Sequence, residues 1–257
     1  MRRKSEHETK GDPGHVGRTF IRPARGSAPG LLLGRGVTTL DRHGFDQLLL
    51  ADDPAQAVRR ALADGSLDEL VPEIRREMDV PQRTHYHQYT VLEHSLRTMA
   101  LMPPRLDERL AGLLHDIGKR RTTTIKERTG EEQYIGHAGA GATIARDVLE
   151  RLGYDQPMVE RVVRWIGRHM DLHMAARDGH SLKARRKLLR RLGDDLQVLK
   201  RLQLADIATM APETAAEKGR EARDYHELLA STGEGCRGRR RGPSPRGPEF
   251  CQRRYHY

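Results

Sequence analysis

The segment LAGLLHDIGKRR, residues 110–121, ends an apolar run on two adjacent side chains that could bind a metal ion, His115 and Asp116. A carboxylate beside an apolar helix face is costly unless a cation or several hydrogen-bond donors neutralise it. Adjacent helical residues point about 100° apart, so both side chains can approach one ion only near a helix end. We therefore expect the helix to end here, with Gly118 letting the backbone turn away and both ligands at the mouth of a helical bundle.

Four more side chains of the same chemical kind are candidate ligands. Asp206 in LQLADIATM is again a carboxylate amid apolar residues, so we expect it to be paired or ligating. His94 in VLEHSL, taken alone, is better explained as a histidine buried in the core. The other two candidates, at helix starts and ends, are His137 in GHAGAG and His169 in GRHMDLH.

The elements that must position these residues are helices. One short helix is delimited by Asp53 as its N-cap, Pro54 in its first turn and Gly65 at its end. The next segment, which starts at Ser66, is predicted to form either a helix kinked at Pro72 or two short helices. The polar segment 118–136 indicates a long loop with a small hairpin. Spacings of three and four residues predict further helices in residues 89–102, 105–117, 137–153, 157–170, 181–193, 194–210 and 212–230. The predicted fold class is all-α, a helical bundle.

The net charge of +10 lies in the two ends of the chain. Residues 1–36 contain eight basic and three acidic side chains, residues 231–257 contain seven and two, and the segment between has 31 of each sign. We therefore predict a disordered basic N-terminal tail (1–36), a helical domain (37–230) and an Arg/Gly/Pro-rich C-terminal tail (231–257). Such tails contact nucleic acid without specificity, if they bind it at all.

Two compositional features restrict the possible classes of protein. The only cysteines, Cys236 and Cys251, lie in the C-terminal segment, which excludes a disulfide framework and a thiolate zinc cluster. Any metal must therefore be bound by histidine and carboxylate side chains. No stretch approaches the roughly 20 apolar residues of a membrane span, and we expect a soluble, cytoplasmic protein without membrane contact.

His94, the pair His115-Asp116 and Asp206 together resemble the metal-binding set of the HD superfamily of metal-dependent phosphohydrolases. Three segments are similar to the HD domain attached to bacterial CCA-adding tRNA nucleotidyltransferases: ELVPEIRREMDVPQRTHYHQYTVLEHSL, LLHDIGKRRT and GHAGAGATIARDVLERLGY. The resemblance covers roughly residues 66–210 with the motifs in the family's order.

The resemblance implies an HD-type bundle and one or two divalent ions of unknown identity. By this resemblance, His94, His115, Asp116 and Asp206 bind the first ion. His137 and His169 complete a second site, with Asp116 shared between the two. His173 lies four residues after His169 but is not part of the family's pattern, and we expect it on the surface.

The implied activity is hydrolysis of phosphomonoester or phosphodiester bonds in nucleotides or RNA ends by a metal-activated water, with Asp116 catalytic. Lys119 is expected to act in catalysis by contacting a substrate phosphate, and Arg120 is a further candidate phosphate contact. The partner would be a nucleotide or an RNA 3′ end. Only about 65 residues precede the HD-like portion, without a turn of the nucleotidyltransferase type, so nucleotide addition is not expected.

Two alternatives remain open at this point. The chain could be an RNA- or nucleotide-binding module, related to tRNA nucleotidyltransferases, whose metal site is structural or inactive. The basic cluster KARRKLLRRLG, residues 183–193, would serve that role if it faces the metal site, but a solvated surface explains it equally well. Alternatively, the histidines are core residues and no metal binds.

Overall fold

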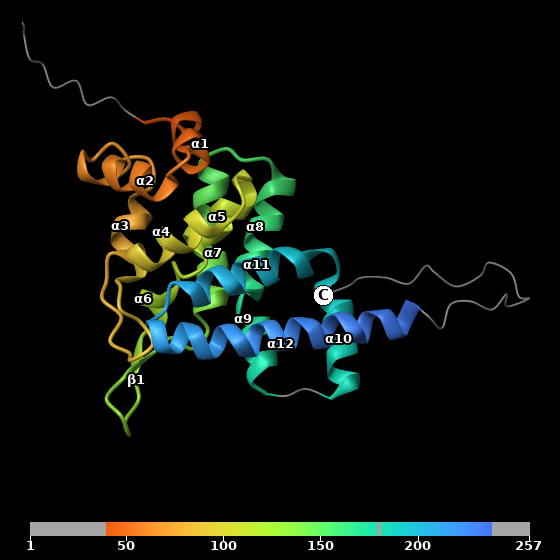
Figure 1. Ribbon diagram of the computed structural model, residues 1–257. Coiled ribbons are helices and arrows are strands. Elements are labelled where there is room, and N and C mark those ends of the chain that lie inside the picture. Colours follow the sequence, from red (N-terminus) through yellow and green to blue (C-terminus); the bar gives the residue numbers. More distant parts are fainter. Residues whose placement is uncertain (1–39, 179–180, 238–257) are drawn as a thin grey trace, which may run out of the picture. The chain divides into compact units, whose positions relative to one another are not determined.

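The computed structural model describes residues 40–178 and 181–237. The predicted tail 1–36 and residues 238–257 of the predicted C-terminal tail lie outside this range. Helices dominate the described part, and the one sheet in it is a two-stranded hairpin, so the all-α prediction is confirmed (Figure 1). Among these residues no helix combines the length and apolar character needed to cross a membrane.

Three helices in the first half of the described chain begin at residues whose side chains cap them. Asp53 accepts a hydrogen bond from the backbone NH of Gln56, and Thr90 accepts one from that of Glu93. Pro72 starts a helix, but residues 66–70 before it form a turn, so only the second part of the segment predicted as helical is a helix. The elements here are α1 (Arg42–Leu50), α2 (Pro54–Ala63), α3 (Pro72–Met78), α4 (Val91–Leu101), α5 (Leu106–Leu114) and α6 (Lys119–Thr122).

The predicted hairpin is present and separates the two halves. Strands β1 (Thr124–Ile125) and β2 (Glu132–Gln133) pair antiparallel, with Thr124 opposite Gln133. The later helices are α7 (His137–Arg151), α8 (Gln156–Arg168), α9 (Met170–Arg177), α10 (Leu182–Leu192), α11 (Leu196–Ala208) and α12 (Pro212–Arg237), with a 3₁₀ turn at Gly193–Asp195. Helix α12 therefore continues beyond residue 230, where we place the end of the domain.

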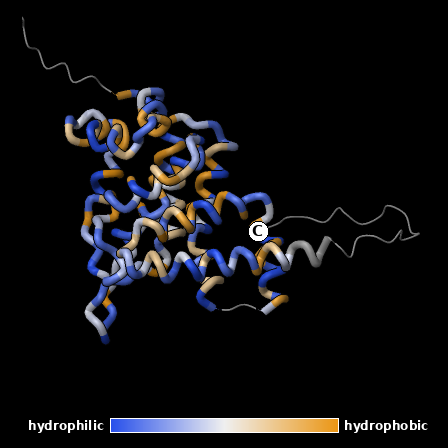
Figure 2. Tube along the Cα trace, in the orientation of Figure 1, coloured by the Kyte–Doolittle hydropathy of each residue, from blue (hydrophilic) through white to orange (hydrophobic). Residues whose placement is uncertain are grey.

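Leucine, isoleucine, valine and methionine side chains fill the core between these helices, and Figure 2 shows apolar stretches interleaved with polar ones along the helices. Helix α4 packs on α5, and α11 packs on α4, α5, α9 and α12. The α4–α5 contact is close at Gly112, where a Cβ atom would lie 2.9 Å from Cα of Met99. This packing brings the end of α11, with Asp206, beside His94 of α4 and the end of α5.

Candidate metal centre

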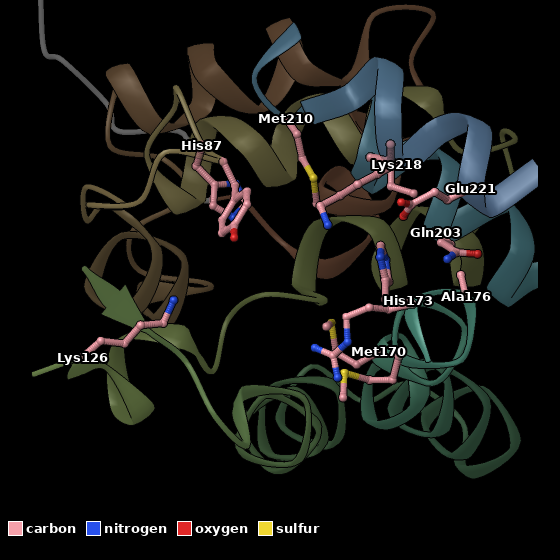
Figure 3. A pocket seen from close by; sticks show the side chains of 13 residues that line it. His87, Lys126, Met170, His173, Ala176, Gln203, Met210, Lys218 and Glu221 are labelled. Atoms are coloured by element: carbon pink, nitrogen blue, oxygen red, sulfur yellow. The ribbon is translucent and has the colours of Figure 1, made fainter. Parts of the chain in front are cut away.

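Two adjoining cavities lie where the hairpin, the start of α7, α9 and the end of α11 meet. The larger, of about 690 Å³, is lined by the carboxylates Asp116 and Asp206 among others. The smaller, of about 350 Å³, shares with it the wall formed by Met170, His173 and Met210 (Figure 3). Both volumes are typical of small-molecule sites.

His115 and Asp116 lie at the end of a helix, as the sequence predicts. Helix α5 ends at Leu114, and the next residues form a turn in which the NH of Lys119 donates to the carbonyl of Asp116 at 3.0 Å. Leaving the regular helix lets the two neighbouring side chains converge: Nε2 of His115 is 3.2 Å from Oδ2 of Asp116. Both side chains are almost completely buried.

The reason we gave for Gly118 was wrong. Its φ of −83° and ψ of −8° are ordinary helical values that any residue adopts. Glycine is needed because α6 begins against α7: a Cβ atom would lie 2.3 Å from the carbonyl oxygen of His137 and 2.4 Å from the nitrogen of Gly141. This close approach places His137, the first residue of α7, beside Asp116.

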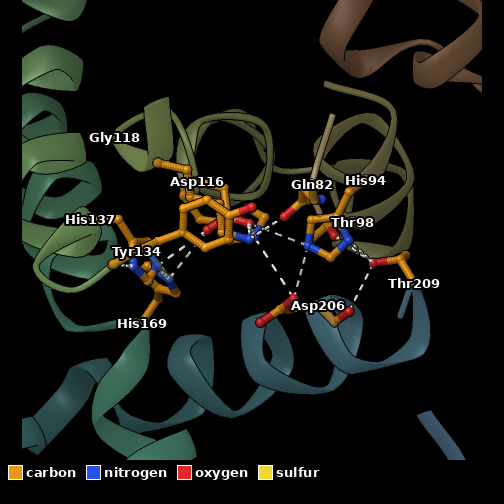
Figure 4. Close-up of polar contacts among 12 residues, drawn as sticks. Gln82, His94, Thr98, Asp116, Gly118, Tyr134, His137, His169, Asp206 and Thr209 are labelled. Atoms are coloured by element: carbon orange, nitrogen blue, oxygen red, sulfur yellow. Dashed lines mark hydrogen bonds and ion pairs between the residues drawn. The ribbon is translucent and has the colours of Figure 1, made fainter. Parts of the chain in front are cut away.

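The six predicted ligands come together as two groups of three (Figure 4). In the first, Nε2 of His94 lies 3.0 Å and Nε2 of His115 4.0 Å from Oδ1 of Asp206. In the second, Nε2 of His137 lies 3.4 Å and Nε2 of His169 3.8 Å from Oδ1 of Asp116.

Asp116 joins the two groups through its two oxygens. Oδ1 faces His137 and His169, whereas Oδ2 lies 3.5 Å from Nε2 of His94 and 3.2 Å from Nε2 of His115. A carboxylate with one oxygen toward each set of ligands is arranged to bridge two ions.

Each histidine is held by a hydrogen bond at its other ring nitrogen. Nδ1 of His115, His137 and His169 lies 2.9, 2.7 and 2.7 Å from the carbonyl oxygens of Gly112, Tyr134 and Ile166. Because a carbonyl only accepts, each Nδ1 carries a proton, and each ring in its neutral form turns the lone pair of Nε2 inward.

A hydroxyl group fixes His94 in the same tautomer, with the proton on Nδ1. The hydroxyl of Thr209 donates to the carbonyl of Asp206 at 2.8 Å and lies 2.8 Å from Nδ1 of His94. It therefore accepts from Nδ1, and the lone pair of Nε2 faces the carboxylates. Such outer hydrogen bonds orient metal-binding histidines in general.

The donor atoms fit a cation between them. Within the described residues, Nε2 of His94 and of His115 are buried without a hydrogen-bond partner, which is a rare arrangement for polar atoms. Nε2 of His137 and of His169 face each other at 3.0 Å although both Nδ1 atoms donate to carbonyls. Two inward lone pairs at this distance require a proton or a metal ion.

Burial and the charges of neighbouring groups shift the pKa values of the candidate ligands. Burial alone would raise the pKa of Asp116, but the charges of His115 and Lys119 outweigh it and hold the pKa well below the usual range. Burial lowers the pKa of His169 to about 3, and charge on His137 and His115 acts in the same direction. Asp116 thus stays ionised and His169 neutral, the forms in which both bind metals.

Burial lowers the pKa of His115, yet the adjacent Asp116 carboxylate reverses the shift, and the net pKa is raised. The carboxylates therefore attract a proton onto this ring when no stronger cation is bound. A divalent ion competes for the same lone pair, because metal binding displaces such protons.

Lys119 is buried, and its Nζ lies 2.6 Å from Oδ2 of Asp116 and 2.7 Å from Oε1 of Gln82. It also lines the larger cavity, so its predicted contact with a substrate phosphate stays a prediction. Arg120 is not brought to the site: its guanidinium donates to the backbone carbonyl of Arg76, and its side chain lines neither cavity.

The sequence interpretation missed His173. We expected a surface residue, but its side chain is mostly buried, and Nε2 lies 3.0 Å from Oδ2 of Asp206. The helix that we predict over 157–170 ends at Arg168, and α9 starts at Met170.

His87 packs its ring edge-on against His94, with centroids 5.2 Å apart. The basic cluster of α10 lines neither cavity.

The HD domain family model matches residues 91–211, a segment that contains all six ligand candidates. Residues 91–211 therefore form an HD domain, and the HD domain family binds divalent metal ions. The predicted resemblance is confirmed. Its fold is accordingly an all-α bundle of the HD type.

Two curated relatives of the chain are tRNA nucleotidyltransferases, and a third is a CCA protein. The chain is 31% identical to the A-adding tRNA nucleotidyltransferase of Deinococcus radiodurans over 186 residues. This alignment covers 70% of the chain and 42% of that protein. The chain is 34% identical over 176 residues, 66% of this chain and 39% of the other, to the CC-adding tRNA nucleotidyltransferase of Thermus thermophilus. The multifunctional CCA protein of Ralstonia nicotianae is 31% identical over 63% of this chain and 37% of its own length. The aligned part spans about two fifths of these relatives.

Proposed function

We propose that the chain is a metal-dependent phosphohydrolase that cleaves phosphomonoester or phosphodiester bonds of nucleotides or RNA ends. The observation that carries the proposal is the Asp116 carboxylate, whose two oxygens face two separate groups of ligands. The family match supports it, because the HD domain defines a superfamily of metal-dependent phosphohydrolases.

In this proposal, one ion would be held by His94, His115, Asp116 and Asp206, and a second by His137, His169 and Asp116. Bound divalent ions acidify a water molecule and neutralise charge on a phosphate. The ligand set does not select among Mn²⁺, Fe²⁺, Co²⁺, Ni²⁺, Zn²⁺ and Mg²⁺. The water oxygen forms a bond to phosphorus, the ester P–O bond breaks, and the departing oxygen takes up a proton.

The protein's own groups orient the substrate and shape the site. The larger cavity opens onto Asp116 and Asp206 and leaves room for a phosphate ester. The ammonium group of Lys119, now paired with Asp116 and Gln82, is proposed to contact a non-bridging phosphate oxygen as a point charge. The fixed Nδ1 hydrogen bonds keep the four rings in place, so that little reorganisation accompanies binding.

The test is to incubate the purified chain with phosphomonoesters and phosphodiesters, nucleotides among them, in the presence of each candidate ion. We expect turnover with at least one ion and a loss of more than about a hundredfold in Asp116→Asn, because ligand loss exceeds the effect of losing an outer partner. Asp224→Asn, an exposed change on α12, is the control. Absence of turnover with every ion would reject the proposal.

The second candidate is an RNA- or nucleotide-binding module with a structural or inactive metal site. It is favoured by the names of two of the relatives, which refer to tRNA, and by exposed cations on α10 such as Lys187 and Arg190. It gains support if Asp116→Asn leaves hydrolysis unchanged while Arg190→Glu weakens the binding of a tRNA-like RNA.

A further inference from the structure

The smaller cavity beside the metal centre is lined by cations from three separate elements. Lys126 comes from the hairpin, Arg177 from the end of α9 and Lys218 from α12. Figure 3 shows Lys126 and Lys218 on different sides of this cavity. Among the described residues, Glu221 is the one carboxylate in the lining. Three cations therefore face one carboxylate, and a cleft with an excess of one charge attracts ligands of the opposite charge.

Lys218 lacks the ion pair that would neutralise its charge within the protein. Its side chain is half-buried, and Nζ lies 5.5 Å from the centroid of the Tyr86 ring. This distance allows a cation–π contact, but an aromatic ring does not neutralise the ammonium group. No carboxylate of the described residues forms an ion pair with Lys218. Its ammonium group is therefore able to bind an anion that enters the cavity.

The other two cations have partners that they can exchange. Nζ of Lys126 lies 3.6 Å from Oε2 of Glu131, and Nε of Arg177 lies 2.7 Å from Oδ1 of the neighbouring Asp178. The side chains of Lys126, Arg177 and Asp178 are all more than a third exposed. Exposed ion pairs of this kind contribute little free energy, so a doubly charged anion in the cavity can replace these partners at little cost.

The two cavities adjoin but differ in their charged groups. The larger one is lined by Asp116 and Asp206, the carboxylates of the metal centre, and Lys218 does not line it. Met170, His173 and Met210 line both cavities. A ligand with one phosphate at the metal centre can therefore extend along this shared wall to the three cations. Metal ions would neutralise its first phosphate, and protein cations would neutralise a second.

We propose that the smaller cavity is a second anion subsite, and that the preferred substrates carry a second phosphate group, which Lys218, Lys126 and Arg177 bind. A nucleoside bisphosphate and an oligonucleotide share this chemistry, because the next phosphodiester of a strand supplies the second anion. A nucleoside monophosphate occupies only one of the two subsites. The inference rests on the proposed function for the first phosphate, whereas anion binding by the smaller cavity does not depend on hydrolysis.

Methionine methyl groups make anion binding observable at this cavity. Inorganic phosphate is titrated into the full chain labelled with ¹³C-methyl methionine, at constant ionic strength and with a chelator that removes divalent ions. We expect the NMR signals of Met170 and Met210 to shift to saturation. The signals of Met78 and Met99, which are buried in the core and line neither cavity, should not shift.

Three variants assign the binding to Lys218. Lys218→Glu is expected to weaken phosphate binding by about tenfold, the lower end of the range for a hydrogen bond to a charged group. Lys218→Arg keeps the charge and should keep most of the affinity. Arg220→Glu makes the same charge change at an exposed residue of α12 that lines neither cavity, and should bind like the wild type. Equal affinities of Lys218→Glu and Arg220→Glu would overturn the inference.

Matched substrates test the preference for a second phosphate. The consumption of adenosine 5′-monophosphate, adenosine 3′,5′-bisphosphate and 5′-phosphorylated diadenylate is followed by anion-exchange chromatography, with an ion that supports turnover. We expect kcat/KM to be about tenfold higher for the bisphosphate than for the monophosphate, and this ratio to approach one in Lys218→Glu. An equal gain for the dinucleotide identifies a nucleic-acid strand as the source of the second anion, and a gain for the bisphosphate alone identifies a terminal phosphate. Equal kcat/KM values for all three substrates would overturn the preference.

The two measurements separate this inference from the proposed function. Phosphate binding that depends on Lys218 in a chain that hydrolyses no ester would reject the proposed function and retain the anion subsite. Hydrolysis without a preference for a second phosphate, in a chain whose methionine signals do not respond to phosphate, would do the opposite.

Discussion

Nε2 of His173 lies 3.0 Å from Oδ2 of Asp206, while Oδ1 of the same carboxylate lies 3.0 Å from Nε2 of His94. Oδ1 of Asp206 therefore faces the proposed first ion, and Oδ2 faces His173 in the cavity wall. His173 is placed to fix the rotation of Asp206, as outer partners of metal ligands do.

His173→Ala is predicted to weaken binding of a divalent ion by about 10- to 100-fold, the usual effect of losing such a partner. Calorimetric titration with Mn²⁺ measures it, and His173→Gln, which keeps a donor, should recover part of the affinity. His43→Ala, at an exposed position on α1, is the control. An affinity equal to that of the wild type would remove His173 from the site.

His137→Ala is predicted to reduce the number of bound ions from two to one, because it removes one ligand of the second group only. The ion held by His94, His115 and Asp206 should remain. Titration of the metal-free protein with Co²⁺, followed by its visible absorption, gives the stoichiometry. Two ions bound to the variant would show that the second group is wrongly assigned.

Gly118→Ala is predicted to destabilise the fold by about 1–3 kcal/mol, because the new methyl group would overlap the backbone of α7. Gly139→Ala lies in α7 itself, where a Cβ atom meets nothing within 4 Å. It should stabilise the protein by about 0.5–1 kcal/mol. Urea unfolding of both variants measures the two effects. Equal stabilities would mean that α6 and α7 do not approach so closely.

Acid stability is predicted to depend on Asp195. Burial raises its pKa, but hydrogen bonds from Arg164 and Trp165 outweigh this, and the pKa lies below the ordinary value of 3.8. A lowered folded-state pKa means that the stabilisation is complete above the ordinary value and is lost as the pH falls through the folded value. Asp195→Asn should therefore lower stability at neutral pH and reduce its loss between about pH 5 and 2. Unfolding curves at several pH values test this, and a parallel pH dependence in both proteins would contradict it.

The helices could be predicted where local chemistry determines them. Asp53 and Pro54 mark the start of α2 with a side-chain cap and a fixed φ, both of which are visible in the sequence. Helix α1 was not predicted, although Asp41 caps it, because its short apolar pattern gives little periodicity to recognise.

The sequence allowed the ligand residues of the site to be chosen, but it did not reveal the positions of all the residues around them. The six ligand candidates could be chosen from residue types and family motifs, and the structure brings them together. The position of His173 depends on the break between α8 and α9 at His169, which periodicity alone does not reveal. The role of Gly118 depends on contact with a helix that follows a long loop, and such contacts leave no local signal.

Metal content measured by mass spectrometry on the wild-type chain and on Asp116→Ala tests the central claim most directly, because the Asp116 carboxylate faces both groups of ligands. The account predicts at least one tightly bound divalent ion per wild-type chain and its loss in the variant. Wild-type protein that retains no ion after incubation with each candidate metal, or equal metal content in the two proteins, would contradict it.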